Sequence, residues 1–227
     1  MEHIGHRGAK REFPENTLAA FARAFERGAD AIELDVHATR DGVVVVHHDP
    51  DLRHPPMGTA TRAIAGLDWD TLRRVDLGGG ARVPSLVEVF EAVPAGKTVY
   101  VELKGRNIEP AVASVVTAVV TSARVTCAVH SFDHDAIARM RTLAPVVPRG
   151  ILFDRTPDDV AAAMRAAGAR DVWPKWSLID DAIVQQVHQA GGRVIAWTVN
   201  SRAEGQRLAA IGVDGLCTDD VRLIAGL

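Results

Sequence analysis

The stretch Ala31-Ile32-Glu33-Leu34-Asp35 places two carboxylates at alternate positions of an apolar segment, and Glu102-Leu103-Lys104 repeats the pattern with a lysine. Alternate residues of a β-strand share a face, so each stretch predicts a strand with two charged side chains on one side. If both faces point inward, three carboxylates and one ammonium group share one space. Burying such a cluster is costly unless a cation and an anionic ligand balance it. The two stretches therefore predict a site for a metal ion and a phosphate-like ligand.

Predicted strands alternate with amphipathic helical stretches almost to the end of the chain, which is typical of β/α units that build a parallel sheet. The predicted strands span residues 3–6, 31–35, 98–103, 125–130, 147–152, 171–173, 193–198 and 215–218. Eight such units in 227 residues predict a (β/α)8 TIM barrel, whose sites form at the carboxyl ends of the strands. An open doubly wound sheet is the alternative architecture for the same alternation.

Polar residues mark the predicted starts of several helices, because their side chains can accept hydrogen bonds from the first backbone N–H groups. These starts are Asn16, Ser85 with Glu88, Thr156 and Pro157 with Asp158 and Asp159, and Ser201 with Glu204.

The dipeptide Asp41-Gly42 predicts a two-residue hairpin turn followed by an antiparallel strand over residues 43–47. With this turn Asp35 lies opposite His48, and directly opposed residues point to the same side of a sheet. The hairpin should therefore return His48 to the mouth of the barrel. Residues from about 50 to 80 are irregular, and we expect them to form a small insertion after the second strand that covers one side of the mouth.

Composition favours one domain over residues 1–227, because the chain is 47% hydrophobic and no linker-like segment divides it. A net charge of −3 argues against a broad nucleic-acid surface. The sequence contains no apolar run of about 18 residues and begins without a leader-like segment. We therefore expect a cytoplasmic protein without a stable membrane anchor, and we leave the oligomeric state open.

Charged side chains near the predicted strand ends suggest how the site is divided. Glu33, Asp35 and Glu102 offer hard oxygen ligands, which suit one divalent cation, Mg²⁺ or Ca²⁺, better than zinc. Arg7 and Lys104 are the candidates for binding an anion, because a guanidinium offers a planar fork to phosphate and an ammonium a compact charge.

Two histidines converge on this predicted mouth. His6 ends the first strand, and the hairpin brings His48 back to the same place. Because histidine exchanges protons near neutral pH, the pair could act as general acid and base. The other histidines lack this convergence in the sequence: His3, His37, His54, His130, His134 and His188. Among them His37 falls on the same predicted face as Asp35.

Several collinear motifs resemble those of the glycerophosphodiester phosphodiesterases. They are His6-Arg7-Gly8, Pro14-Glu15-Asn16-Thr17, Glu33-Leu34-Asp35-Val36, Val46-His47-His48-Asp49, Val101-Glu102-Leu103-Lys104, Ser131-Phe132, Trp197-Thr198-Val199-Asn200, and Gly212-Val213-Asp214-Gly215 with Thr218-Asp219. The resemblance implies a TIM barrel that uses a divalent cation to hydrolyse small glycerophosphodiesters to glycerol 3-phosphate and an alcohol.

By position, the resemblance also implies a role for each site residue. His6 and His48 would be the acid and base histidines, Glu33, Asp35 and Glu102 the metal ligands, and Arg7 and Lys104 the phosphate contacts. Glu15 and Asn16 would support the mouth, and Trp197 would form an apolar wall for the glycerol.

Two other functions compete with this interpretation. A related barrel phosphodiesterase could act on a lysophospholipid or a phosphoinositide, although aromatic residues, which would help such a protein contact lipid, make up only 5% of the chain. A non-catalytic phosphate-binding barrel would be expected to have lost one of the five proposed histidines and metal ligands, and all five are present. The sequence leaves open whether water or the glycerol 2-hydroxyl attacks, and which histidine is the acid.

Overall fold

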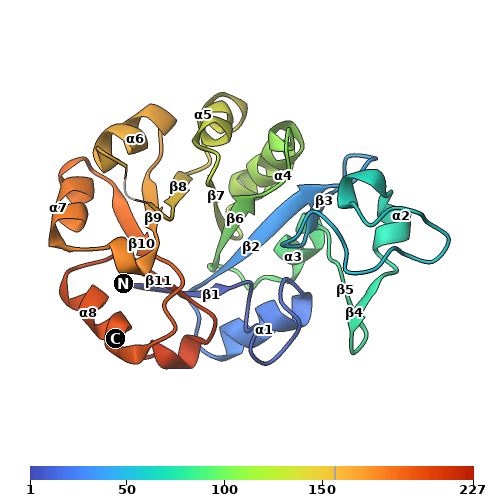
Figure 1. Ribbon diagram of the computed structural model, residues 1–227, viewed down its shortest axis with the longest axis horizontal. Coiled ribbons are helices and arrows are strands. Elements are labelled where there is room, and N and C mark those ends of the chain that lie inside the picture. The colour runs from blue at the N-terminus through green and yellow to red at the C-terminus, as the bar shows by residue number, and fades with distance from the viewer. Residues whose placement is uncertain (156) are drawn as a thin grey trace.

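Eight parallel strands close into a barrel surrounded by helices, as the computed structural model of residues 1–155 and 157–227 shows (Figure 1). The ring closes because β1 pairs with both β11 and β2. This closure confirms the predicted TIM barrel and excludes the open sheet. The barrel strands are β1 (Glu2–His6), β2 (Ala31–Ala38), β6 (Thr98–Leu103), β7 (Thr126–Ser131), β8 (Arg149–Phe153), β9 (Asp171–Pro174), β10 (Arg193–Ala196) and β11 (Gly215–Thr218).

Helices cover the outside of the barrel because each turns an apolar face toward the strands. They are α1 (Leu18–Glu26), α3 (Leu86–Ala92), α4 (Glu109–Ser122), α5 (His134–Leu143), α6 (Val160–Ala167), α7 (Asp181–Gln189) and α8 (Arg202–Ala210), with short 3-10 turns η2 (Trp176–Leu178) and η3 (Val221–Leu223). None of the described helices is both long and apolar enough to cross a membrane.

The predicted helix starts are partly correct. The capping box of Ser85 and Glu88 is present at α3. At α1 the cap is Thr17 rather than Asn16, whose side chain turns into the barrel instead. Ser201 precedes α8 but makes no side-chain capping bond. Of the predicted start over residues 156–159, Thr156 lies outside the described residues, while Asp159 caps α6 by accepting a hydrogen bond from the Ala162 N–H.

Apolar side chains fill the barrel interior below the strand ends. The residues of this layer are Ile4, Ala31, Tyr100, Ala128, Leu152, Trp173, Ile195 and Cys217. At the amino ends of the strands the Tyr100 hydroxyl donates to Glu2 at 2.6 Å, and Arg193 donates to the same carboxylate at 2.8 Å. These contacts close the lower end, so the mouth at the carboxyl ends is the face left for a ligand.

The hairpin register differs from the prediction by one residue. Strand β3 (Val44–Val46) pairs with β2 so that Val36 faces Val46. The Thr39 N–H donates to the Val43 carbonyl, and the turn that this bond closes holds three residues, 40–42, rather than two. Gly42 at φ +85° donates its N–H to the Thr39 carbonyl, a turn that adds one residue to the loop. His48 therefore lies beyond the paired strand rather than opposite Asp35.

The expected insertion follows this hairpin and extends to one side of the barrel, at the right of Figure 1. It contains η1 (Ile64–Gly66), α2 (Trp69–Leu72) and the small antiparallel pair β4 (Asp76–Gly78) and β5 (Ala81–Arg82). A separate apolar cluster holds it together: Val45, Leu52, Ile64, Leu67, Leu72 and Val83.

The turn after β1 depends on Gly8, which has φ +80° and lies against the backbone of α1. A Cβ atom at this position would come within 2.6 Å of the carbonyl carbon of Ala20. Gly42 has a similar φ, but a Cβ atom there would meet nothing within 4 Å. A side chain at Gly42 would therefore meet only backbone strain, whereas a side chain at Gly8 would meet both strain and a steric clash.

We expect Gly8→Ala to lower the free energy of unfolding by at least about 3 kcal/mol, because strain and a backbone clash add together. Gly42→Ala should cost only about 1–2 kcal/mol, the cost of the left-handed conformation alone. Urea unfolding of both variants checks the difference. Equal losses would contradict the close approach of this turn to α1.

Candidate active site

A pocket of about 290 Å³ opens at the carboxyl ends of the barrel strands. Its lining comes from all eight barrel strands or the segments that follow them, and from the segment after β3: His6, Arg7, Glu33, His48, Glu102, Lys104, His130, Phe132, Leu152, Trp173, Trp197, Thr198 and Cys217. One side of this lining is charged and the other is aromatic. Among the described residues, none from the 51–80 insertion lines the pocket.

Two of the predicted metal ligands converge with a histidine that the sequence did not single out. Atoms of Glu33, Glu102 and His130 that could coordinate an ion all lie within 4.8 Å of one another. Oε1 of Glu33 and both ring nitrogens of His130 are buried and have no hydrogen-bond partner among the described residues. Buried polar atoms are normally paired, so these atoms fit a bound cation.

The same three groups have shifted protonation equilibria. Burial and the nearby Asp35 raise the pKa of Glu33 to about 7. Burial, Asp35 and Glu33 likewise raise the pKa of Glu102 to about 7. Burial lowers the pKa of His130 to about 4, so its imidazole is neutral at pH 7, the form that can bind a metal. Without a cation, the two glutamates are therefore held only partly ionised near neutral pH.

Asp35 is fully buried and takes a different set of partners. Its Oδ2 accepts a hydrogen bond from the Asn16 amide at 2.8 Å and lies 3.1 Å from Nε of Arg7. Burial opposes ionisation, but Arg7, the Asn16 bond and Lys104 outweigh it and keep the pKa of Asp35 below its usual value. Asp35 lies outside the group of three, yet its Oδ1 has no hydrogen-bond partner among the described residues. Its assignment as a metal ligand stays a prediction.

The two predicted anion-binding side chains both reach the pocket. Lys104 Nζ lies 3.2 Å from Glu102 and 3.7 Å from Asp35. Arg7 has φ +57°, and its backbone N–H donates to the Glu33 carbonyl at 2.9 Å. This conformation turns the Arg7 side chain back over the strand ends, where it contacts Asp35.

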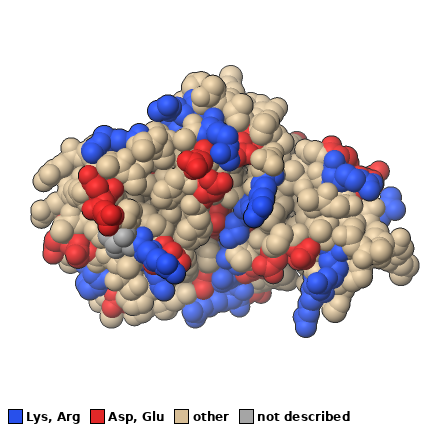
Figure 2. Space-filling view, turned by 45° about the horizontal axis from the view of Figure 1, so that its top comes forward, with Lys and Arg blue, Asp and Glu red and all other residues tan. Residues whose placement is uncertain are grey.

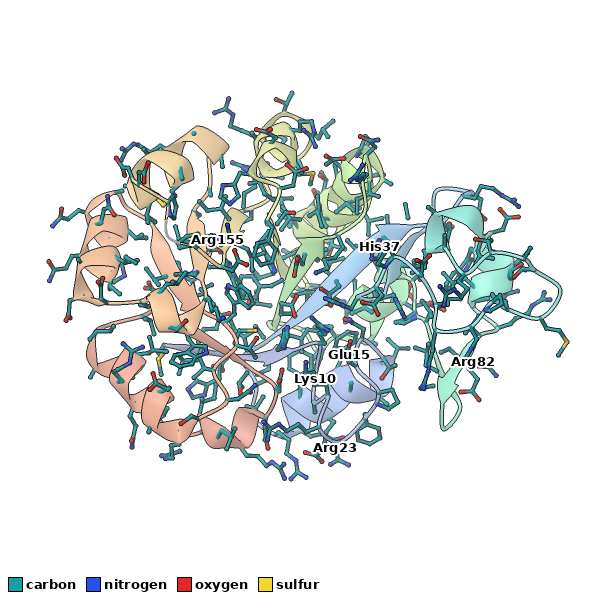
Figure 3. The ribbon with its side chains drawn as sticks, viewed as in Figure 1. Lys10, Glu15, Arg23, His37, Arg82 and Arg155 are labelled. Atoms are coloured by element: carbon teal, nitrogen blue, oxygen red, sulfur yellow. The ribbon has the colours of Figure 1, made fainter. Side chains whose placement is uncertain are left out.

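Glu15 and Asn16 support this mouth in different ways. Glu15 accepts a hydrogen bond from Nη1 of Arg7 at 2.9 Å and lies 3.7 Å from Nζ of Lys10. Figure 3 shows Lys10 and Glu15 close together beside α1. Asn16, at φ +59°, is buried and holds Asp35. Both residues therefore contact the charged groups of the site, and their supporting role stays a prediction.

The two candidate histidines both line the pocket, whereas the neighbouring His47 does not. Nδ1 of His6 lies 2.6 Å from Oδ1 of Asp219. Nδ1 of His48 lies 2.7 Å from Oδ1 of Asp49, which is exposed. His37 is buried, and its Nε2 contacts the His48 carbonyl at 3.1 Å, so it anchors the His48 backbone.

Aromatic side chains form the opposite wall. Trp197 donates its indole N–H to the Trp173 carbonyl at 2.8 Å, which fixes the ring. The Phe132 ring meets Trp197 edge to face at 5.4 Å between centroids, and the His130 ring stacks on Trp173 at 4.4 Å. The wall gives an apolar surface opposite the charged groups.

His130 and Asp219 were not assigned a role from the sequence. Their places in the site depend on the register between neighbouring parallel strands. Glu102 pairs with His130, and Gly5 pairs with Thr218, the residue before Asp219. The sequence signals are the position of His130 at the end of one predicted strand and of Asp219 just after another, together with the motif Thr218-Asp219. These signals do not give the register.

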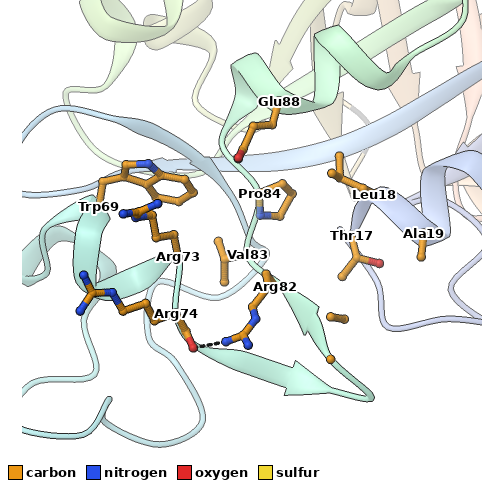
Figure 4. A pocket seen from close by; sticks show the side chains of 12 residues that line it. Thr17, Leu18, Ala19, Trp69, Arg73, Arg74, Arg82, Val83, Pro84 and Glu88 are labelled. Atoms are coloured by element: carbon orange, nitrogen blue, oxygen red, sulfur yellow. Dashed lines mark hydrogen bonds between the residues drawn. The ribbon is translucent and has the colours of Figure 1, made fainter.

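A larger hollow of about 550 Å³ lies between the insertion and α1 (Figure 4). Three arginines line it, but Arg73 pairs with Asp70 and Arg82 donates to the Arg74 carbonyl. It has no histidine or aspartate among its described lining residues. The chemistry-bearing groups are therefore in the smaller pocket at the barrel mouth.

Outside the pocket, basic and acidic side chains are interspersed over the face shown in Figure 2.

Comparison with known proteins identifies the family of this chain. The model of the glycerophosphoryl diester phosphodiesterase family matches residues 6–223. A glycerophosphodiester phosphodiesterase of Caldanaerobacter subterraneus subsp. tengcongensis is 31% identical, over 99% of this chain and 96% of the relative.

Solved structures share the fold. A glycerophosphodiester phosphodiesterase of Agrobacterium tumefaciens has a TM-score of 0.81 with 26% identity, covering 100% of both chains. An Oleispira antarctica phosphodiesterase, solved with the product sn-glycerol-3-phosphate, has a TM-score of 0.87 with 24% identity, covering 99% of this chain and 95% of that one. With the family model matching nearly the whole length, this chain belongs to the glycerophosphoryl diester phosphodiesterase family.

Proposed function

We propose that this phosphodiesterase hydrolyses small glycerophosphodiesters to glycerol 3-phosphate and an alcohol, with one divalent cation and with His6 and His48 as acid and base. The observation that carries the proposal is the meeting in one pocket of two histidines, two cationic side chains and Glu33, whose buried Oε1 has no hydrogen-bond partner among the described residues. Family membership supplies the substrate class.

The cation would be held by Glu33, Glu102 and His130, with Oδ1 of Asp35 available beside them. Mg²⁺ or Ca²⁺ fits a site dominated by carboxylate oxygens. When bound, such an ion neutralises charge on the non-bridging phosphate oxygens as the phosphorus becomes five-coordinate.

Arg7 and Lys104 would bind the same phosphate. Each already balances buried carboxylates, and each lines the pocket, so a phosphate entering there meets positive charge that the protein has oriented in advance. Trp197 and its aromatic neighbours would contact the carbon atoms of the glycerol.

The two histidines would then exchange protons with the substrate. One removes the proton from the attacking oxygen, which is either water or the glycerol 2-hydroxyl. The other protonates the departing alkoxide as the bond from phosphorus to the alcohol oxygen breaks. If the 2-hydroxyl attacks, a water later opens the cyclic phosphate, so both routes consume one water and release the same products.

We expect His6→Ala and His48→Ala each to lower kcat by about 10²–10⁴-fold, because each removes one proton-transfer group. The assay is release of glycerol 3-phosphate from glycerophosphoethanolamine with Mg²⁺ or Ca²⁺, and with chelator as a blank. His47→Ala is the matched control, since His47 lies outside the pocket and should leave kcat unchanged. Retention of wild-type kcat by either pocket variant would contradict its role, and turnover in chelator would contradict the cation.

Cation binding should also change stability in a pH-dependent way. Folding raises the pKa of Glu33 from 4.5 to about 7, so between these pH values and without a cation Glu33 is protonated to a greater extent in the folded chain than in the unfolded chain. The contribution of this group to the free energy of unfolding therefore falls as pH rises through that window. Glu102 follows the same rule.

A divalent cation binds the ionised carboxylates, so its stabilising effect should grow over the same window. We expect the increase in melting temperature on adding excess Mg²⁺ or Ca²⁺ to be larger at about pH 8 than at about pH 5. Glu33→Gln should remove most of the increase, while Glu26→Gln on the exposed side of α1 should keep it. An increase that is independent of pH, or equal in both variants, would contradict this cation site.

A further inference from the structure

The contact between His6 and Asp219 follows from the pairing of β1 with β11. Gly5 pairs with Thr218, so the residues that follow them, His6 and Asp219, lie side by side at the mouth. Nδ1 of His6 and Oδ1 of Asp219 are 2.6 Å apart. The Asp219 side chain is 16% exposed, so this bond is largely shielded from water.

Asp219 is itself held in place by further groups. Its Oδ2 accepts a hydrogen bond from the Asn200 amide at 2.7 Å, and its backbone N–H donates to Oδ1 of the same asparagine at 3.0 Å. Nζ of Lys10 lies 3.2 Å from Oδ1. The carboxylate therefore cannot rotate away from His6 without losing its contacts with the Asn200 amide and Lys10, and the backbone bond to Asn200 holds Asp219 itself in place.

Among the residues that the structure describes, the ring of His48 has no comparable support. Its Nδ1 partner, Asp49, is the adjacent residue and has a side chain that is 68% exposed. The anchoring contact from His37 reaches only the His48 backbone. Of the two pocket histidines, His6 is thus the one with a braced carboxylate.

A braced carboxylate determines which nitrogen of the ring carries the proton. Although burial opposes ionisation, the His6 contact and the Asn200 bond keep the pKa of Asp219 well below its usual value, so this group only accepts. Nδ1 of His6 must then be the donor, and Nε2, which lies 3.9 Å from Oε2 of Glu33, is left with its lone pair toward the pocket.

We propose that Asp219, braced by Asn200 and Lys10, is a positioning residue that fixes His6 in the Nδ1–H tautomer and directs Nε2 at the substrate. Its effect on turnover rests on the proposed function, whereas the tautomer itself does not. The same arrangement can hold the ring in place whether His6 accepts or donates a proton at Nε2.

The test combines ¹⁵N NMR of the histidine rings with kinetics, using the full chain in the presence of Mg²⁺. In the wild type we expect the neutral His6 ring to carry its proton on Nδ1. Asp219→Asn keeps the shape but can donate, so we expect a mixture of tautomers and a kcat lower by about 10²-fold, with KM changed by less than about twofold. Asp219→Glu should recover part of kcat.

Asp220→Asn is the matched control, because Asp220 is the adjacent carboxylate and pairs with Arg222 instead. It should leave kcat and the His6 ring signals unchanged. A wild-type ring protonated on Nε2, or an Asp219→Asn variant as active as Asp220→Asn, would overturn the proposal. If the wild type hydrolyses no glycerophosphodiester, the proposed function fails, while the ring signals of the wild type still decide the tautomer.

Discussion

The structure depends on the burial of three carboxylates at one end of a barrel. Glu33, Asp35 and Glu102 project among apolar strands, where an unbalanced charge is costly. Arg7 and Lys104 compensate for part of this charge, and the compensation is uneven. Asp35 receives an arginine, a lysine and an amide and stays ionised, whereas the pKa values of both glutamates rise to about 7. The remaining imbalance is what a divalent cation would remove.

The surrounding fold keeps this cluster in one arrangement. Its members stand on neighbouring strands that also form the core of the barrel, so their positions cannot relax independently. The turn that follows β1 adds the loop residues: Arg7 and Asn16 both adopt left-handed conformations, and Gly8 lets the turn approach α1. Such conformations are costly for residues other than glycine and persist because Glu33 and Asp35 bind both residues. The charge cluster and the turn therefore stabilise one another.

Much of the fold and part of the site geometry follow from patterns along the chain. Alternating carboxylates in apolar strands placed Glu33, Asp35 and Glu102 together, because the two-residue period of a strand is local. The position of His130 beside Glu102 could not be predicted in this way, because it depends on the register between two strands. That register is set by packing along the whole length of both strands. The predicted register of the hairpin was wrong for a related reason. One added loop residue, Gly42 in a left-handed conformation, shifted every pair, although His48 still reached the pocket from beyond the paired strand.

The central claim is that the buried carboxylates and His130 hold a cation next to the phosphate of the substrate. Anomalous diffraction from a crystal grown with Mn²⁺ and glycerol 3-phosphate tests it most directly. One anomalous peak coordinated by Glu33, Glu102 and His130, with the phosphate between it and Arg7 or Lys104, is the predicted result. A cation bound elsewhere, or a phosphate bound in the arginine-lined hollow beside α1 with the barrel mouth left empty, would contradict the account.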